Sequence, residues 1–157
     1  MKKQGKYLGE ILVGKGFITD DELQAVIQEQ LRNKKFLGEM LIEKGLISED
    51  DLLKTLADQF EIEPIRLKDA PIDWEAASGF SSSLITDHKC LPIKSDAETV
   101  TVVIANPLDV WALDKAEKDV APRKLKILLT TTSDMDEAIK EYRRRSIRNM
   151  MKKWKKE

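Results

Sequence analysis

The chain has 157 residues, of which 41% are hydrophobic and 35% charged, with a formal net charge of −1 and a single cysteine. These values are typical of a soluble globular protein with one domain, or one domain and a small lobe, and they exclude a disordered chain. No apolar stretch is long enough to cross a bilayer, and the N-terminus lacks the apolar core and cleavage site of a signal peptide. We therefore expect a cytoplasmic protein. The single cysteine excludes an intramolecular disulfide and agrees with a reducing compartment.

Charge is unevenly distributed along the chain. Residues 140–157 carry nine basic and two acidic side chains, a net of +7, whereas the other 139 residues carry 18 basic and 26 acidic ones, a net of −8. We do not expect the acidic body to bind nucleic acid, and no nucleic-acid-binding motif accompanies the basic end. The basic end is instead suited to an anionic surface.

The N-terminal part of the chain contains an internal duplication. Ten of 23 positions are identical between residues 8–30 and residues 37–59, and the two copies begin 29 residues apart. Each copy has the apolar spacing of a short helix, then a Lys-Gly turn, then a second helix that begins with a capping box or its near equivalent. The second helices are expected to end near Arg32 and Phe60. The duplication therefore predicts a lobe of two helix-turn-helix repeats over residues 5–61.

After Pro64 the pattern becomes that of a mixed α/β lobe. It predicts strands at residues 65–67 and 124–130, a β-hairpin of residues 89–93 and 99–105, and short helical pieces at 74–77 and 82–86. A helix is expected to begin at Asn106-Pro107, and Ser133 to Asp136 are expected to cap a long final helix. The expected fold class is α/β (α+β mixed): the helical lobe, an α/β lobe at 62–145 with a small mixed sheet flanked by helices, and a basic amphipathic helix extension or linker at 146–157.

The doubled Leu-Gly…Gln pattern indicates a binding site made of two equal halves. Leu-Gly is expected at the start of a short helix, where glycine lets another molecule approach the backbone and free N–H groups favour an anion. The closing glutamine offers an acceptor and two donors at a fixed distance. Two such half-sites side by side suit a flat, phosphorylated ligand that is itself duplicated. The alternative is that the repeated apolar residues and caps serve only to fold two helical hairpins.

The repeated string resembles the MshEN motif, which belongs to the N-terminal domain of type II secretion and type IV pilus assembly ATPases (GspE N-terminal-like). The strings that carry the resemblance are LGEILVGKGFITDDELQAVIQEQ and, after the spacer, LGEMLIEKGLISEDDLLKTLADQ; IANPLD from Ile104 and the segment Asp136–Tyr142 resemble the family's usual ending. The resemblance covers roughly residues 5–143. It implies a non-catalytic regulatory domain that binds cyclic di-GMP, with a secretion or pilus assembly ATPase or platform protein as partner.

The resemblance also implies which residues bind the ligand. They are Tyr7, Leu8, Gly9, Leu23, Ile27 and Gln30 in the first half-site and Phe36, Leu37, Gly38, Leu52, Leu56 and Gln59 in the second. Binders in the family usually have arginine immediately before Leu-Gly, whereas this chain has Tyr7 and Phe36, each preceded by a lysine (Lys6 and Lys35). An aromatic ring keeps the stacking on guanine, but the planar charged fork is lost. The alternative function is therefore a protein-protein adaptor that docks a secretion or pilus component, with ligand binding weakened or lost.

No further motif indicates catalysis, a cofactor or a metal site. The chain has no P-loop, so we do not expect an enzyme. His88 and Cys90 have no third or fourth Cys or His to complete a zinc site, and Cys90 is expected to be a small buried residue beside a strand. Ser81, Ser82 and Ser83 are explained by a polar loop that leads into a helix.

The end of the chain is predicted to be a basic amphipathic helix. Its basic residues surround an apolar set that is predicted to share one face: Ile139, Tyr142, Ile147, Met150, Met151 and Trp154. Such a helix suits an acidic partner or a peripheral contact with an anionic membrane. The alternative is that its first half packs on the sheet and its end is a solvated linker.

Overall fold

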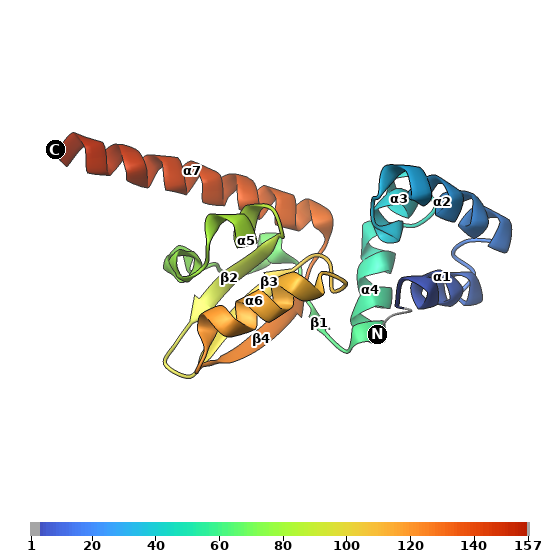
Figure 1. The fold of residues 1–157 in the computed structure, drawn as a ribbon, viewed down its shortest axis with the longest axis horizontal. Coiled ribbons are helices and arrows are strands. Elements are labelled where there is room, and N and C mark those ends of the chain that lie inside the picture. The colour runs from blue at the N-terminus through green and yellow to red at the C-terminus, as the bar shows by residue number, and fades with distance from the viewer. Residues whose placement is uncertain (1–3, 157) are drawn as a thin grey trace. The chain divides into compact units, whose positions relative to one another are not determined.

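The chain divides into two compact units, unit 1 (Met1–Ile62) and unit 2 (Glu63–Glu157) (Figure 1). The structure, a computed structural model, describes the backbone of residues 4–156 and the side chains of residues 8–155. Unit 1 is helical and unit 2 contains the sheet, so the predicted fold class, with a helical part followed by a mixed α/β part, is confirmed.

Unit 1 consists of two helical hairpins. The helices are α1 (Gln4–Gly14), α2 (Asp20–Asn33), α3 (Leu37–Glu43) and α4 (Glu49–Phe60). Gly16 and Gly45 follow the first helix of each hairpin with φ angles of +81° and +72°, the left-handed conformation predicted for them. Thr19 and Glu22 form the predicted capping box: the Thr19 N–H donates to Glu22 Oε1 (2.9 Å) and the Glu22 N–H donates to Thr19 Oγ1 (3.1 Å).

The two hairpins pack on each other in a symmetric way. α1 contacts α4, and α2 contacts α3. Because α1 and α3 are equivalent in the duplication, as are α2 and α4, exchanging the two repeats converts one of these contacts into the other. A head-to-tail row of repeats lacks the α1–α4 contact, so the contact pattern is that of a pseudo-twofold arrangement.

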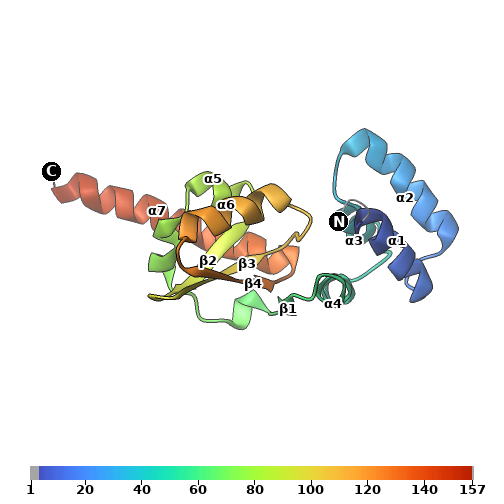
Figure 2. The ribbon, with the colours of Figure 1, turned by 60° about the horizontal axis from the view of Figure 1, so that its bottom comes forward.

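Unit 2 is built on a four-stranded mixed sheet with the strand order β1-β4-β3-β2. The strands are β1 (Glu63–Pro64), β2 (Cys90–Ser95), β3 (Thr99–Ile104) and β4 (Lys124–Leu129). β2 and β3 form the predicted antiparallel hairpin, whereas β4 is parallel to both β3 and β1. The parallel pair β3–β4 requires a crossover, which α6 (Val110–Val120) supplies across one face of the sheet (Figures 1 and 2).

Shorter elements and the long final helix complete unit 2. They are the 3₁₀ helices η1 (Leu67–Asp69) and η2 (Trp74–Gly79), and the helices α5 (Ser82–Thr86) and α7 (Thr132–Lys156). α7 is continuous, so residues 146–156 belong to the same helix whose first turns bury Met135 and Ile139.

Asp134 joins η1 to the start of α7. Arg66 donates to its carboxylate from Nε (3.2 Å) and Nη2 (3.3 Å), and the Lys68 N–H donates to Oδ2 (3.2 Å). Burial by itself raises the pKa of Asp134, but the hydrogen bonds from Arg66 and Lys68 and the charge of Arg66 outweigh it. The pKa of Asp134 therefore lies below its ordinary value.

Two predicted boundaries are wrong. Residues 65–67 do not form a strand, because β1 ends at Pro64 and the Leu67 N–H turns to Thr130 Oγ1 (3.3 Å) as η1 begins. α6 does not begin at Asn106-Pro107 either. Asn106 Oδ1 accepts the Leu108 N–H (3.0 Å) in a turn, and Asp109 is the N-cap, with Oδ1 accepting the Ala112 N–H (3.1 Å).

The apolar residues of α7 differ in exposure along the helix. Ile139 is buried and Tyr142 half-buried, whereas Ile147, Met150, Met151 and Trp154 are exposed. Residues 139 and 154 are about four and a sixth turns apart and so point in similar directions; the difference arises because the second half of α7 extends beyond the sheet (Figures 1 and 2).

Candidate functional site

The doubled motif places its residues on all four helices of unit 1. Equivalent positions have similar environments: Leu8, Gly9 and Leu23 are buried in the first repeat, and Leu37, Gly38 and Leu52 in the second. The two motif glutamines, Gln30 and Gln59, are half-buried near the ends of α2 and α4, and Ile27 is half-buried whereas Leu56 is buried. The side chains of Lys6 and Tyr7 lie outside the described residues.

Each motif glycine is a point of close packing between two helices. A Cβ atom on Gly9 would lie 2.8 Å from Leu23 Cδ1, and one on Gly38 would lie 2.8 Å from Leu52 Cδ2. Glycine therefore lets the two helices of each hairpin approach. We expected another molecule beside each glycine, but Leu23 and Leu52 fill the space on the side where a Cβ would lie.

The position of Leu-Gly within its helix differs between the repeats. Leu37 and Gly38 are the first residues of α3, as predicted, and Phe36 is the N-cap without a side-chain capping bond. In the first repeat the prediction is wrong, because α1 begins upstream at Gln4 and Gly9 lies within the helix. The Leu-Gly of the second repeat therefore has the free N–H groups of a helix start, whereas the Leu-Gly of the first repeat lies inside α1.

Gln30 is partly engaged inside the chain. Its Nε2 donates to the backbone carbonyl of Lys35 (3.0 Å), so it fixes the linker between α2 and α3. This contact joins two residues five positions apart in the chain, immediately before Phe36. A ligand that uses the same donor has to compete with the Lys35 carbonyl.

Phe36 and Lys35 present a ring and a positive charge at the start of α3. The Phe36 side chain is 44% exposed, and an exposed aromatic face can stack on a flat ring. Lys35 Nζ donates to both carboxylate oxygens of Glu43 (2.9 and 3.2 Å). This hydrogen bond and the charge of Glu43 raise the pKa of Lys35, so the lysine stays charged but is already paired. Sequence reasoning missed Glu43, because no local pattern places it beside a lysine in the preceding loop.

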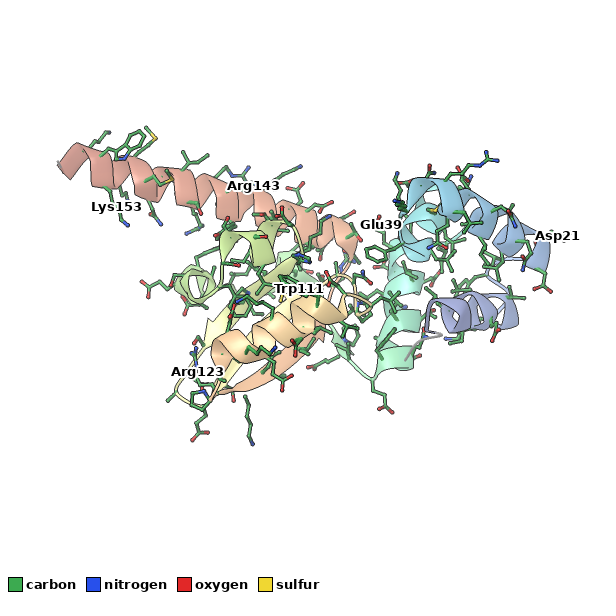
Figure 3. The ribbon with its side chains drawn as sticks, viewed as in Figure 1. Asp21, Glu39, Trp111, Arg123, Arg143 and Lys153 are labelled. Atoms are coloured by element: carbon green, nitrogen blue, oxygen red, sulfur yellow. The ribbon has the colours of Figure 1, made fainter. Side chains whose placement is uncertain are left out.

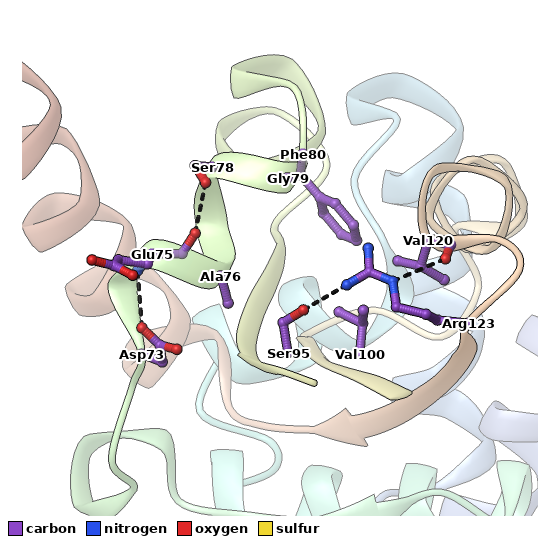
Figure 4. A pocket seen from close by; sticks show the side chains of 10 residues that line it. All are labelled: Asp73, Glu75, Ala76, Ser78, Gly79, Phe80, Ser95, Val100, Val120 and Arg123. Carbon is purple, nitrogen blue, oxygen red and sulfur yellow. Dashed lines mark hydrogen bonds between the residues drawn. The ribbon is translucent and has the colours of Figure 1, made fainter. Parts of the chain in front are cut away.

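Two cavities of unit 2 are lined by residues outside the doubled motif. The first, of about 320 Å³, is bordered by η2 and by Arg123, whose Nη1 donates to Ser95 Oγ (2.6 Å) and whose Nε donates to the Val120 carbonyl (3.3 Å) (Figure 4). The second, of about 690 Å³, lies between η2 and α7, where the Arg145 guanidinium stacks 4.9 Å from the centre of the Trp74 ring. The Arg123 and Arg145 contacts join elements of unit 2 to one another.

The residues singled out for metal or nucleophilic chemistry have structural surroundings. His88 Nδ1 lies 2.8 Å from Asp109 Oδ2, and the His88 ring stacks on Trp111 with centroids 4.4 Å apart. Cys90 is buried in β2, and burial, followed by the charges of Asp109 and Asp119, raises its pKa to about 12. Within residues 4–156, no cluster of three or more His, Cys, Asp or Glu side chains is arranged to hold a metal ion. A thiol with this pKa is not a nucleophile at neutral pH.

The fold and the site together define a class: a domain with a duplicated helical-hairpin unit followed by a small mixed α/β unit. The model of the MshEN domain family matches residues 60–149 of this chain, which is more than half of it. The chain therefore belongs to the MshEN domain family. The matched segment covers most of unit 2 and the last residue of α4, so it includes none of the doubled motif.

Solved structures show the same fold over both units. The structure of MshE with cdg (cyclic di-GMP) is 23% identical, with a TM-score of 0.74, and the match covers 86% of this chain and 97% of that one. The N-terminal domain of XpsE is 22% identical, with a TM-score of 0.68, covering 85% of this chain and 91% of that one. A comparison with curated proteins found no match. None of the helices described here combines the length and apolar character needed to cross a bilayer.

Proposed function

We propose that this chain is a cytoplasmic, non-catalytic regulatory domain that binds cyclic di-GMP through unit 1 and acts on a secretion or pilus assembly ATPase or platform protein. The observation that carries the proposal is the pseudo-twofold arrangement of the two repeats, in which α1 contacts α4 as α2 contacts α3. Cyclic di-GMP is built from two equal halves, so a symmetric pair of half-sites can hold one molecule. The fold shared with MshE, solved with this ligand, supports the choice of ligand.

The chemistry of the half-sites favours stacking over ion pairing. In place of the arginine that the family resemblance implies, the second repeat offers the exposed ring of Phe36 beside Lys35. Stacking of a base on an aromatic ring contributes about 1–3 kcal/mol. The missing bidentate contact to phosphate costs about 1.5–3 kcal/mol. We therefore expect binding that is weaker than that of an arginine-bearing site.

Ligand binding can regulate a partner only if the ligand prefers one arrangement of the domain. A ligand held by both repeats contacts residues of both hairpins, so its affinity depends on how α1 and α2 lie against α3 and α4. If a partner also prefers that arrangement of unit 1, the ligand raises the affinity for the partner. The partner then raises the affinity for the ligand by the same factor.

A second candidate function, a protein-protein adaptor without a nucleotide ligand, is favoured by three specific contacts. Leu23 and Leu52 fill the space beside the motif glycines, Gln30 is bonded to the Lys35 carbonyl, and Lys35 is paired with Glu43. These contacts lie within unit 1 and support a structural role for the motif residues. The two functions therefore differ in one measurable property, which is affinity for cyclic di-GMP.

Calorimetric titration separates these functions. We expect saturable binding of cyclic di-GMP to the whole chain, and a loss of about 5- to 150-fold in affinity in Phe36→Ala, because one stacking contact is removed. Leu31→Ala is the matched control, since Leu31 is 75% exposed and adjacent to Gln30 but is not a motif residue. Absence of heat, together with no change in melting temperature at about 100 µM ligand, contradicts the receptor function and leaves the adaptor.

A further inference from the structure

The C-terminal half of α7 carries a stripe of exposed apolar side chains. Its residues, Ile147, Met150, Met151 and Trp154, are 59%, 55%, 52% and 71% exposed. They are spaced by three, four and seven residues, so they lie on one face of the helix. Both views of the ribbon show this half of α7 extending beyond the sheet (Figures 1 and 2).

The stripe is exposed because α7 runs past the sheet of unit 2 (Figures 1 and 2). Ile139, in the part of the helix that packs on unit 2, is buried, whereas Trp154 is 71% exposed although it lies only about a sixth of a turn from Ile139 in direction. Next to the stripe, the Arg145 guanidinium stacks on Trp74 of η2, and Met150 borders the cavity between η2 and α7. Four large apolar side chains on an unpacked helix end form an exposed patch, which calls for an explanation.

Unpaired positive charge surrounds the stripe. From Tyr142 to Lys156 the chain has no acidic residue. Arg144 and Arg145 pair with Glu141. Five further basic side chains of this segment are exposed and form no ion pair with the described residues: Arg143, Arg148, Lys152, Lys153 and Lys155. Figure 3 labels Arg143 and Lys153 near the two ends of this segment.

We propose that this face of α7 binds the surface of an anionic lipid bilayer. The helix lies in the plane of the membrane, with the stripe among the upper acyl chains and the basic side chains at the phosphates. Charge complementarity selects this partner, because basic residues flank the stripe and a planar anionic surface meets all of them at once. A second copy of the helix brings like charges together. The exposed Trp154 is a residue type that suits the interface between lipid and water.

The proposal is tested with vesicles of phosphatidylcholine alone and of phosphatidylcholine with phosphatidylglycerol, using the whole chain. In a Trp74→Phe/Trp111→Phe variant, Trp154 is the one remaining tryptophan of three. We expect its emission to shift to shorter wavelength, and the protein to co-sediment, with the anionic vesicles and not with the neutral ones. Lys152→Ala/Lys153→Ala/Lys155→Ala is expected to weaken binding roughly a hundredfold, at about fivefold per residue.

Variants of the stripe decide whether the apolar side chains enter the membrane. Met151→Ser/Trp154→Ser is expected to abolish co-sedimentation. The control Trp111→Ser removes a tryptophan that is 55% exposed on α6 and is expected to leave binding unchanged; circular dichroism checks that both variants fold. Lack of binding to anionic vesicles overturns the proposal. So does binding that survives Met151→Ser/Trp154→Ser, or a concentration-dependent dimer that depends on the stripe, which assigns this face to a second copy.

Discussion

At the scale of single residues, the motif glycines show how one atom sets the distance between two helices. The hydrogen of Gly38 leaves room for Leu52, and the hydrogen of Gly9 leaves room for Leu23. Sequence predicted the importance of both glycines but assigned the free space to a ligand, because a linear pattern does not show which neighbour occupies it. The same limit applies to Lys35, whose partner Glu43 is revealed by the fold.

We predict that Gly38→Ala destabilises the protein through Leu52. The added Cβ would lie 2.8 Å from a Leu52 methyl group, and overpacking of this kind costs about 1–3 kcal/mol against a gain of up to about 1 kcal/mol in helix propensity. Denaturant unfolding should therefore show a loss of about 1 kcal/mol. In a Leu52→Ala background the same change should cost nothing, whereas an equal cost in both backgrounds contradicts the contact. Gly14→Ala, with no atom within 4 Å of the new Cβ, is the matched control.

We also predict that Phe36→Arg tightens the binding of cyclic di-GMP. Arginine restores a planar charged group that can stack on guanine and contact phosphate together, and a charge-assisted contact of this kind corresponds to roughly 10- to 100-fold in affinity. Combining it with Tyr7→Arg should add to the effect. Leu31→Arg introduces the same charge at a nearby exposed position and should change affinity little. Equal tightening in Leu31→Arg means that the gain is general electrostatics and not a restored site.

At the scale of elements, the predictions that succeeded rest on local patterns. The capping box at Thr19, the β2–β3 hairpin and the helix at residues 82–86 all follow from residues close in sequence. The errors arise where distant residues decide the outcome. Leu67 leaves the strand direction because Thr130, 63 residues away, accepts its N–H. The exposure of the C-terminal half of α7 depends on where the sheet ends beneath the helix, which no local pattern contains.

We predict that Asp134 stabilises unit 2 in a pH-dependent way. Its carboxylate accepts hydrogen bonds from Arg66 and from the Lys68 N–H, and its pKa in the folded protein is lowered. A lowered pKa means that the stabilisation is complete above the unfolded-state value, for which the model value is 3.8, and is lost as the pH falls through the folded-state pKa.

Asp134→Asn should therefore reduce the free energy of unfolding at neutral pH by about 1–2 kcal/mol, since one charge-assisted contact is weakened next to a partly exposed arginine. The difference between the variant and the parent protein should shrink in acid, measured by urea unfolding from neutral pH to below pH 3.8. Asp136→Asn, which affects the ion pair of Lys89 with a more exposed carboxylate (47% against 6% for Asp134), is the control. A difference that does not change with pH contradicts the role given to the Asp134 charge.

At the scale of the whole molecule, the two units support different conclusions, one about the family and one about the ligand. Unit 2 carries most of the match that shows the family, and unit 1 carries the symmetric repeats from which we infer a ligand. Sequence predicted the duplication, the fold class and the family. It did not contain the packing of α1 on α4, which turns a tandem repeat into a pseudo-twofold pair and gives the proposed ligand a matching symmetry.

The stoichiometry of cyclic di-GMP binding tests the central claim most directly. If one symmetric ligand is shared by both repeats, titration of the whole chain saturates at one molecule per chain. Gln30→Ala in the first repeat and Phe36→Ala in the second each weaken that single event. Two independent binding events per chain, or an affinity that responds to substitutions in one repeat alone, contradict a shared site even if the ligand binds.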